Sequence, residues 1–222
     1  TRGDLLATWQ AKIPPDAPNR FIVNIQPEQR ALVEEFFAAN GLRQPEIYPM
    51  VRGRYVALNG TAVNSDDFVE RARRLVEREF NLSYMQSLPP HNILTAGRVF
   101  STNDMARGAL SVEDGIAKTL GWKLGDVLTW QVGGENFTAE IVNLRRLDWD
   151  SMRVNFFVIA TPALLEKAAT SYITSFHLAA GQAALMQQLS RRLPNVTVVD
   201  MSALLKQAQD LVGQVVRAVQ FI

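Results

Sequence analysis

The chain has 222 residues, and 47% of them are hydrophobic, which is enough for one large domain or two small ones. Its 23 basic and 22 acidic residues leave a formal net charge of +1, so no general attraction to nucleic acid or to an anionic membrane is expected. The absence of cysteine excludes disulfides, zinc–thiolate sites and a cysteine nucleophile. No run of about 18 apolar residues occurs, so no segment of this sequence is expected to span a bilayer.

The first part of the chain predicts a β-α-β unit. Residues 20–25 are rich in β-branched and aromatic side chains, as strands are. Residues 27–40 predict a helix that has a proline in its first turn and ends at Gly41. Residues 45–58 alternate as a long strand does, and Pro49 within them indicates a bend or an edge position.

A similar unit recurs near the end of the chain. Residues 171–178 and 196–199 predict strands, and residues 181–193 predict a helix that Pro194 ends. Two β-α-β halves that can share one sheet are the pattern of a split, ferredoxin-like α+β layer. About 110 residues separate the halves, which is too long for a loop, so residues 59–169 are expected to fold as an inserted subdomain.

The insert begins with a highly charged segment. Residues 65–79 predict a helix, with Asp66 and Asp67 near its N-terminus. Acidic and basic side chains interleave along it, which favours a solvated helix face over a nucleic-acid site. The later part of the insert is expected to be rich in strands, with Gly133-Gly134 as a hairpin turn. The further elements expected in it are strands at 80–85, 127–130 and 137–142 and a helix at 112–120.

Both ends of the chain predict helices with one apolar side. Residues 4–11 are a short amphipathic segment, and residues 202–222 form a longer pattern that becomes more apolar toward its end. Two interpretations of the last segment stay open: a helix packed on the core, or a stalk helix that leads to a membrane. Because each apolar stripe is narrow, we expect the two helices to lie side by side and to leave the domain in the same direction.

The search for chemistry yields no catalytic, cofactor or metal site. His91 and His177 are far apart in the sequence and show no metal-ligand spacing. Asp148 and Asp150 could form a carboxylate pair, yet no base or nucleophile is spaced to join them. Nucleophile elbows and phosphate-binding glycine loops are both absent from the sequence. The strand at 21–25 has a single aromatic side chain, so an RNA-binding sheet is not expected.

Several segments carry a family resemblance that covers nearly the whole chain. The sequence is similar to the first large extracytoplasmic domain of YbbP-type permeases, a branch of the MacB/FtsX superfamily of ABC transporter permeases. The segments that carry the likeness are Arg78-Glu79-Phe80-Asn81-Leu82-Ser83-Tyr84, Leu88-Pro89-Pro90-His91-Asn92, Ala96-Gly97-Arg98 and the block 120–142.

The resemblance implies a fold and a function. It implies a Porter subdomain of split β-α-β units, here residues 1–58 and 170–222, and an inserted Sabre subdomain, here residues 59–169. It also implies a polytopic inner-membrane permease whose domain lies in the periplasm and moves when a separate cytoplasmic ATPase hydrolyses ATP. The implied substrate is hydrophobic or lipid-like, an esterase or lysophospholipase is an implied partner, and no residue is carried over as catalytic.

Two rival functions remain open from the sequence. One is a soluble periplasmic ligand-binding or adaptor protein, and the other is an α+β hydrolase. The uncapped, apolar end of the chain argues against the first, and the missing catalytic motifs argue against the second.

Overall fold

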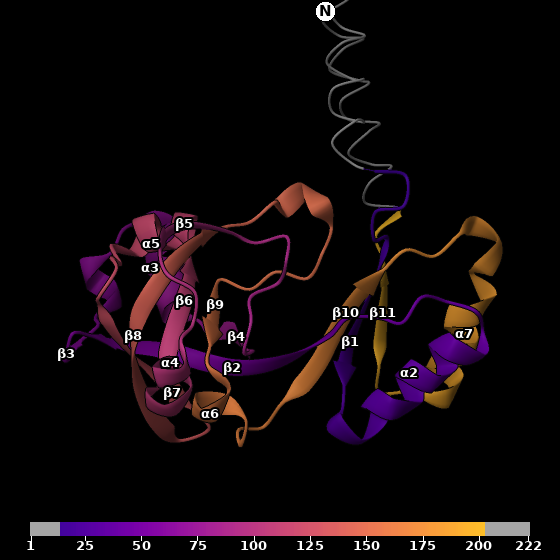
Figure 1. Cartoon of the computed structure of the whole chain (residues 1–222), viewed down its shortest axis with the longest axis horizontal. Helices are drawn as coiled ribbons and strands as arrows, with labels where there is room; N and C mark the ends of the chain where they lie inside the picture. Colours follow the sequence, from indigo (N-terminus) through magenta and orange to yellow (C-terminus); the bar gives the residue numbers. More distant parts are fainter. Residues whose placement is uncertain (1–13, 203–222) are drawn as a thin grey trace, which may run out of the picture. The chain divides into compact units, whose positions relative to one another are not determined.

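The computed structural model describes residues 14–202, which divide into two compact units of mixed helices and strands (Figure 1). Within this range the first unit holds residues 14–48, 149–154 and 172–202, and the second unit holds residues 49–148 and 155–171. The terminal helices expected at 4–11 and 202–222 lie outside the described residues, apart from Ser202.

A four-stranded sheet with two helices forms the first unit. Its strands are β1 (Arg20–Ile25), β10 (Ser171–Phe176), β11 (Thr197–Asp200) and the start of β2 (Ile47–Leu58), in the order β11-β1-β10-β2. The strands around Phe21 and Ile173 were expected to share one sheet, and β1 and β10 are antiparallel neighbours. The helices α2 (Arg30–Ala39) and α7 (Ala184–Arg192) lie on the same side of this sheet (Figure 1).

The pattern of apolar residues explains the packing of these helices. In α2 the side chains of Val33, Phe36 and Phe37 repeat at helical spacing and are buried against the strands. Short 3-10 turns precede both helices, η1 (Pro27–Gln29) before α2 and η4 (Ala180–Gln182) before α7. Burial of this stripe, rather than helix propensity, therefore holds α2 in place, and Met186 and Leu189 are the buried residues of α7.

The second unit contains a sheet that closes on itself. The pairings run β2-β4-β9-β6-β8, and β7 pairs with both β8 and β2, so they return to the first strand. Two short strands lie off this ring, because β3 pairs with β2 and β5 pairs with β8. The strands are β3 (Thr61–Ala62), β4 (Phe80–Tyr84), β5 (Ile93–Gly97), β6 (Ala109–Glu113), β7 (Val127–Val132), β8 (Glu135–Arg146) and β9 (Val158–Ala160).

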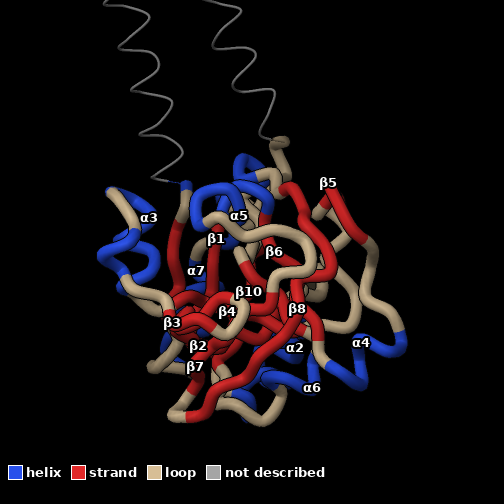
Figure 2. Tube along the Cα trace, turned by 90° about the vertical axis from the view of Figure 1, so that its left-hand side faces the viewer, coloured by secondary structure: helices blue, strands red, loops and turns tan. Residues whose placement is uncertain are grey.

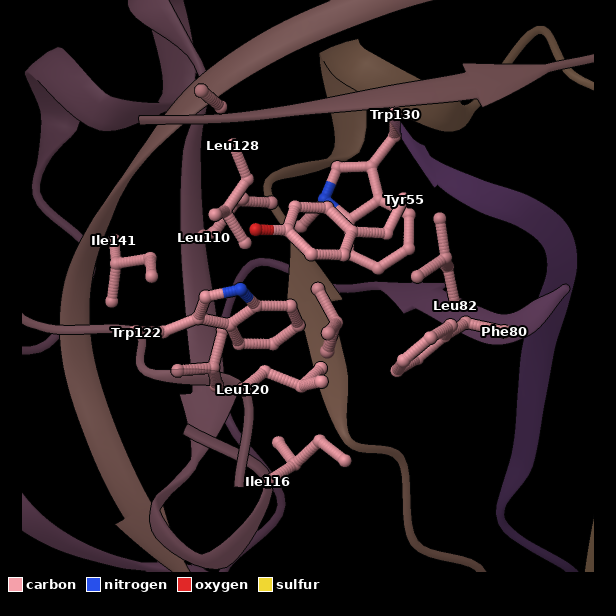
Figure 3. Packing of buried hydrophobic residues seen from close by; sticks show 14 of the residues in the cluster. Tyr55, Phe80, Leu82, Leu110, Ile116, Leu120, Trp122, Leu128, Trp130 and Ile141 are labelled. Atoms are coloured by element: carbon pink, nitrogen blue, oxygen red, sulfur yellow. The ribbon is translucent and has the colours of Figure 1, made fainter. Parts of the chain in front are cut away.

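Large aromatic side chains fill the interior of this closed sheet (Figure 3). Tyr55, Trp122 and Trp130 meet edge to face or tilted, with ring centroids between 5.2 and 6.1 Å apart. Aliphatic side chains such as Leu110 and Ile141 surround them. The interior is therefore a packed core and not a channel, as in other narrow barrels.

Two helices of the second unit begin later in the chain than the sequence predicted, and β8 (Glu135–Arg146) is longer than the strand expected at 137–142. The helix expected at 112–120 is α5 (Asp114–Leu120), because Val112 belongs to β6 and the Glu113 carboxylate caps the helix by accepting from the Ile116 amide. The helix expected at 65–79 is split into η2 (Ser65–Asp67) and α3 (Glu70–Glu77), because Phe68 and Val69 are extended. The remaining short helices are α4 (Thr102–Arg107), η3 (Trp149–Ser151) and α6 (Pro162–Leu165).

Strand β2 is shared between the units. Ile47 and Tyr48 belong to the first unit, and the strand continues from Pro49 into the second. The boundary expected after Leu58 therefore falls later in the chain than the one observed, because the whole of the strand was assigned to the first unit. A strand of twelve residues is long enough to pair with β10 at its start and with β4 and β7 farther on.

Candidate functional site

The residues considered as catalytic candidates lie apart. His91 precedes β5 in the second unit, whereas His177 follows β10 in the first and places its Nδ1 3.0 Å from the Ala17 carbonyl oxygen. Asp148 follows β8, and Asp150 lies in η3. Between residues 14 and 202, no three histidine, aspartate or glutamate side chains gather as metal ligands do.

At the Gly97-Arg98 pair, the end of β5 approaches the backbone of β8 closely. Gly97 has a φ of +80°, and a Cβ at this position would collide with the Val142 carbonyl oxygen and lie 2.8 Å from the Asn143 Cα. The Asn143 side chain donates to the Arg98 carbonyl oxygen at 3.0 Å, which fixes the chain directly after β5. Glycine is therefore required here for both its backbone conformation and its lack of a side chain.

Arg98 and Asp104 form an ion pair that orders the next loop. The guanidinium donates to both carboxylate oxygens of Asp104, one of them at 3.1 Å. Asp104 and Ser101 also cap α4 reciprocally, with Asp104 accepting from the Ser101 amide at 2.7 Å and Ser101 from the Asp104 amide at 3.2 Å. The hydrogen bonds from Arg98 and then from Ser101 lower the pKa of Asp104 to about 2 against the cost of burial.

Replacing Asp104 with asparagine is expected to destabilise the second unit by about 1–2 kcal/mol at neutral pH. Because the folded pKa lies below the ordinary value of 3.8, the stabilisation is present in full above that value and is lost as the pH falls toward 2. Urea unfolding of both proteins at pH 7 and at pH 3 measures this, and the difference should shrink at the lower pH.

The matched control for this change is Asp66→Asn. Asp66 pairs with Arg73 at 3.1 Å, but its side chain is 73% exposed, so its loss should have almost no effect. A difference between the Asp104 variant and the original protein that is the same at both pH values would contradict the role given to the ionised carboxylate.

An exposed apolar edge lies beside this loop. Strand β5 has β8 as its only partner among the described strands, and Figure 2 shows it at an outer edge of the second unit. Ile93 at its start is 53% exposed, and Val99 just beyond its end is 65% exposed. Leu124 is 42% exposed, and one of its methyl groups lies next to Gly97. We call Ile93, Val99 and Leu124 the apolar edge, because exposed apolar side chains along an open strand are typical of an interaction site.

The segment from Leu120 to Asp126 carries Leu124 of the apolar edge and holds it at the surface. Gly121 has a left-handed conformation that ends α5, and Trp122 after it is buried in the core. The Asp126 carboxylate accepts from the Lys123 amide at 2.9 Å and from the Asn59 side chain at 3.1 Å. These contacts hold the turn that carries Leu124 at the surface.

A fully buried arginine lies at the far end of β8. The guanidinium of Arg145 donates to the Ser111 hydroxyl at 2.9 Å, to the Asn92 side-chain oxygen at 3.0 Å and to the Phe156 carbonyl oxygen at 2.6 Å. Burial lowers the pKa of Arg145 to about 9, and the negative charge of Glu113 acts in the opposite direction. Glu113 and Arg145 are paired residues on the parallel strands β6 and β8.

Sequence reasoning missed Arg145. Its neighbour Arg146 is exposed, as alternation along a strand requires, so the pair resembled two surface charges. The available signal was that Arg145 shares a face with Asn143 and Ile141, which are both buried.

The comparisons with known proteins place the chain in a family. It is 36% identical over 208 residues to the uncharacterized ABC transporter permease YbbP of Escherichia coli K12, a match that covers 93% of this chain. The chain belongs to the YbbP-type family of ABC transporter permeases. It spans 24% of the length of YbbP, so it corresponds to one segment of such a permease.

One solved structure has a weak likeness to the chain. A solved domain assigned to a permease protein from Porphyromonas gingivalis covers 82% of this chain and 91% of its own, with 10% identity and a TM-score of 0.38. No family model matches the chain. Within residues 14–202 no helix has the length and apolar character needed to cross a membrane.

The segments that carried the resemblance have structural roles in this permease domain. Gly97 permits the close approach of β5 to β8, Arg98 orders the loop to α4, and Trp122 lies in the core. Leu124 in these segments and the neighbouring Val99 are exposed apolar residues, beside the exposed charged side chains of Arg98 and Lys123. The two exposed apolar side chains are suited to contact with another surface.

Proposed function

We propose that this chain is the extracytoplasmic, periplasmic domain of a YbbP-type permease and that it transmits movement. A cytoplasmic ATPase subunit would supply the energy, and the domain would carry it to the periplasmic side of the inner membrane. The observation that carries the proposal is the 36% identity to YbbP across 93% of this chain. The packed interior of the second unit supports it, because a rigid body passes on displacement without deforming.

The proposal includes a division into Porter-like and Sabre-like subdomains. The strand order β11-β1-β10-β2, with both helices on one side, supports a ferredoxin-like Porter layer in the first unit. The closed sheet of the second unit supports a separate, strand-rich Sabre-like insert.

We further propose a hydrophobic or lipid-like substrate and a periplasmic partner such as an esterase or lysophospholipase. The apolar edge supports an apolar contact of this kind. The domain itself should hydrolyse neither ATP nor esters, and turnover that one substitution such as His177→Ala abolishes without unfolding would contradict this.

Cysteine labelling in whole cells tests the location. Because this chain has no cysteine, Val99→Cys places one exposed thiol on the apolar edge of a full-length permease whose other cysteines have been replaced. A membrane-impermeant maleimide should label it in intact spheroplasts. Ala160→Cys is the buried control and should stay unlabelled. Labelling of Val99→Cys only after lysis would place the domain in the cytoplasm and overturn the proposal.

Distance measurement tests the transmission of movement. Spin labels at Val99 in the second unit and at Gln187 in α7 report the separation of the two units in the full-length permease with its ATPase. We expect the distance distribution to differ between the nucleotide-free and ATP-bound states. Unchanged distances in a complex that hydrolyses ATP and transports would show that these two units do not move relative to each other during the cycle.

A further inference from the structure

The helical side of the first unit contains an apolar hollow. It has a volume of about 230 Å³ and is lined by Leu32 and Phe36 from α2 and by Leu189, Arg192 and Leu193 from α7 and the residue after it. Four of the five side chains are apolar, and the fifth carries a positive charge. This volume is equivalent to about eight water-sized groups, so it suits a single chain and not a bulky ring system.

The floor of the hollow is part of the folded core. Phe36, Leu189 and Leu193 are between 1% and 5% exposed, so they cannot move away without disrupting the unit. Leu32 forms a wall and is 38% exposed, although it belongs to the apolar stripe of α2. An open apolar wall above a fixed apolar floor leaves hydrophobic surface that a ligand chain could cover.

Paired amides hold the two helices together at one end. The side chains of Gln29 and Asn195 exchange two hydrogen bonds of 2.7 and 2.9 Å. The backbone carbonyl oxygen of Asn195 also accepts from the Asn24 side chain at 2.9 Å. Gln29 directly precedes α2, and Asn195 follows the end of α7. The hollow is therefore preformed, which lowers the entropic cost of binding.

Arg192 is the one charged side chain among the residues that line the hollow, and the exposed Glu35 of the facing helix is not among them. Arg192 lies in the last turn of α7, is exposed and makes no hydrogen bond or ion pair with another residue between 14 and 202. On the facing helix, Glu34 is paired with Arg30 at 3.1 Å. An arginine that lacks a partner beside an apolar floor matches a ligand with one apolar chain and one anionic head, because guanidinium binds carboxylate or phosphate in a fork.

We propose that the hollow between α2 and α7 binds one chain of a single-chain anionic amphiphile, with Arg192 on its head group. This inference rests on the proposed function in one respect only, since such an amphiphile would belong to the hydrophobic class proposed as substrate. The site itself stands on the lining residues and on the unpaired charge.

Calorimetric titration of the 222-residue chain with dodecanoate below its micelle concentration tests the proposal, and the hollow has room for about eight of the twelve carbon atoms. We expect saturable binding, about tenfold tighter than for the neutral 1-dodecanol, because only the carboxylate engages Arg192. Arg192→Gln should remove this tenfold preference. Leu32→Gln should weaken both ligands about five- to tenfold, and its exposure makes the change compatible with folding.

The neighbouring Arg191 supplies the matched control. Arg191 is also exposed and unpaired among the described residues but does not line the hollow, so Arg191→Gln should leave both affinities unchanged. Equal affinity for the two ligands, or equal effects of the two arginine variants, would overturn the proposal. So would Leu32-dependent dimerisation without dodecanoate binding, or binding confined to anionic phosphatidylglycerol vesicles, because these assign the hollow to a second copy or to a membrane surface.

The two proposals fail separately. Absence of dodecanoate binding, with labelling and distance changes intact in the full-length permease, would remove only the ligand site. Binding that persists while Val99→Cys is labelled only from the cytoplasmic side would remove the proposed function and leave the site.

Discussion

Replacing Arg145 with methionine is expected to destabilise the second unit by about 3–5 kcal/mol, because each acceptor left without its donor costs about 1–3 kcal/mol. The change leaves the Ser111 hydroxyl, the Asn92 side-chain oxygen and the Phe156 carbonyl oxygen without the donor they now share. It also removes the positive charge that the negative charge of Glu113, its paired residue on β6, now favours. Methionine is flexible and keeps the apolar stem of the side chain, so the loss should reflect these polar groups more than the packing of the stem.

Urea unfolding followed by tryptophan fluorescence measures this effect, because Trp122 and Trp130 report on the core of the second unit. Arg146→Met is the matched control, since Arg146 is the adjacent residue, carries the same charge and is exposed. It should change the free energy of unfolding by about 0.5 kcal/mol or less. Arg145→Lys should fall between the two, because an ammonium group keeps the charge but loses the fork. Equal effects of the two methionine variants would show that Arg145 is not an essential buried donor.

Gly97→Ala is expected to be the next most damaging change, with a loss of at least about 3 kcal/mol. Alanine would have to adopt a φ of +80°, and its methyl group would collide with the backbone of β8 at Val142 and Asn143. The backbone of β8 cannot easily yield, because both of these residues are buried and Asn143 is paired with β5 on one side and with β6 on the other. We therefore expect β5 to separate from β8 and the loop at Arg98 to lose its position.

Gly134→Ala separates the two causes. Gly134 has a φ of +86° in the β7–β8 hairpin, but a Cβ there would have no heavy atom within 4 Å. Its substitution should cost about 1 kcal/mol, the strain of the left-handed conformation alone. Thermal unfolding of the two variants gives the comparison. A Gly97 variant no less stable than the Gly134 variant would mean that the close approach to β8 relaxes without cost.

The local elements were predictable where a single stripe or alternation decides the structure. The strand at 20–25 has the bounds expected from its residues, and the stripe Val33, Phe36 and Phe37 indicated the buried face of α2. The hairpin at Gly133-Gly134 followed from glycine at a turn between two alternating segments. In each case the interactions that set the structure lie close together in the sequence.

The closed sheet and the buried arginine were not predictable in the same way. The parallel pairs β4·β9 and β6·β8 join residues that are distant in the sequence, and no local pattern records which strands meet. Arg145 is buried because Ser111, Asn92 and Phe156 converge on it from three separate segments. The start of α5 was misplaced for a related reason, since Glu113 ends a strand and caps a helix at once.

Strand β2 contributes residues at the same alternating positions to both hydrophobic cores. Ile47 is buried in the core of the first unit, and Val51 and Tyr55 are buried in the core of the second, each four positions after the last. Side chains alternate along a strand, so the even spacing gives all three the same parity. One residue inserted after Tyr48 would reverse that parity, and whichever core kept its register would oblige the other to expose its apolar side chains to water. A two-residue change in β2 would preserve this parity in both units, whereas a single-residue change would require a compensating β-bulge, like the irregularity that β2 has between Tyr55 and Ala57.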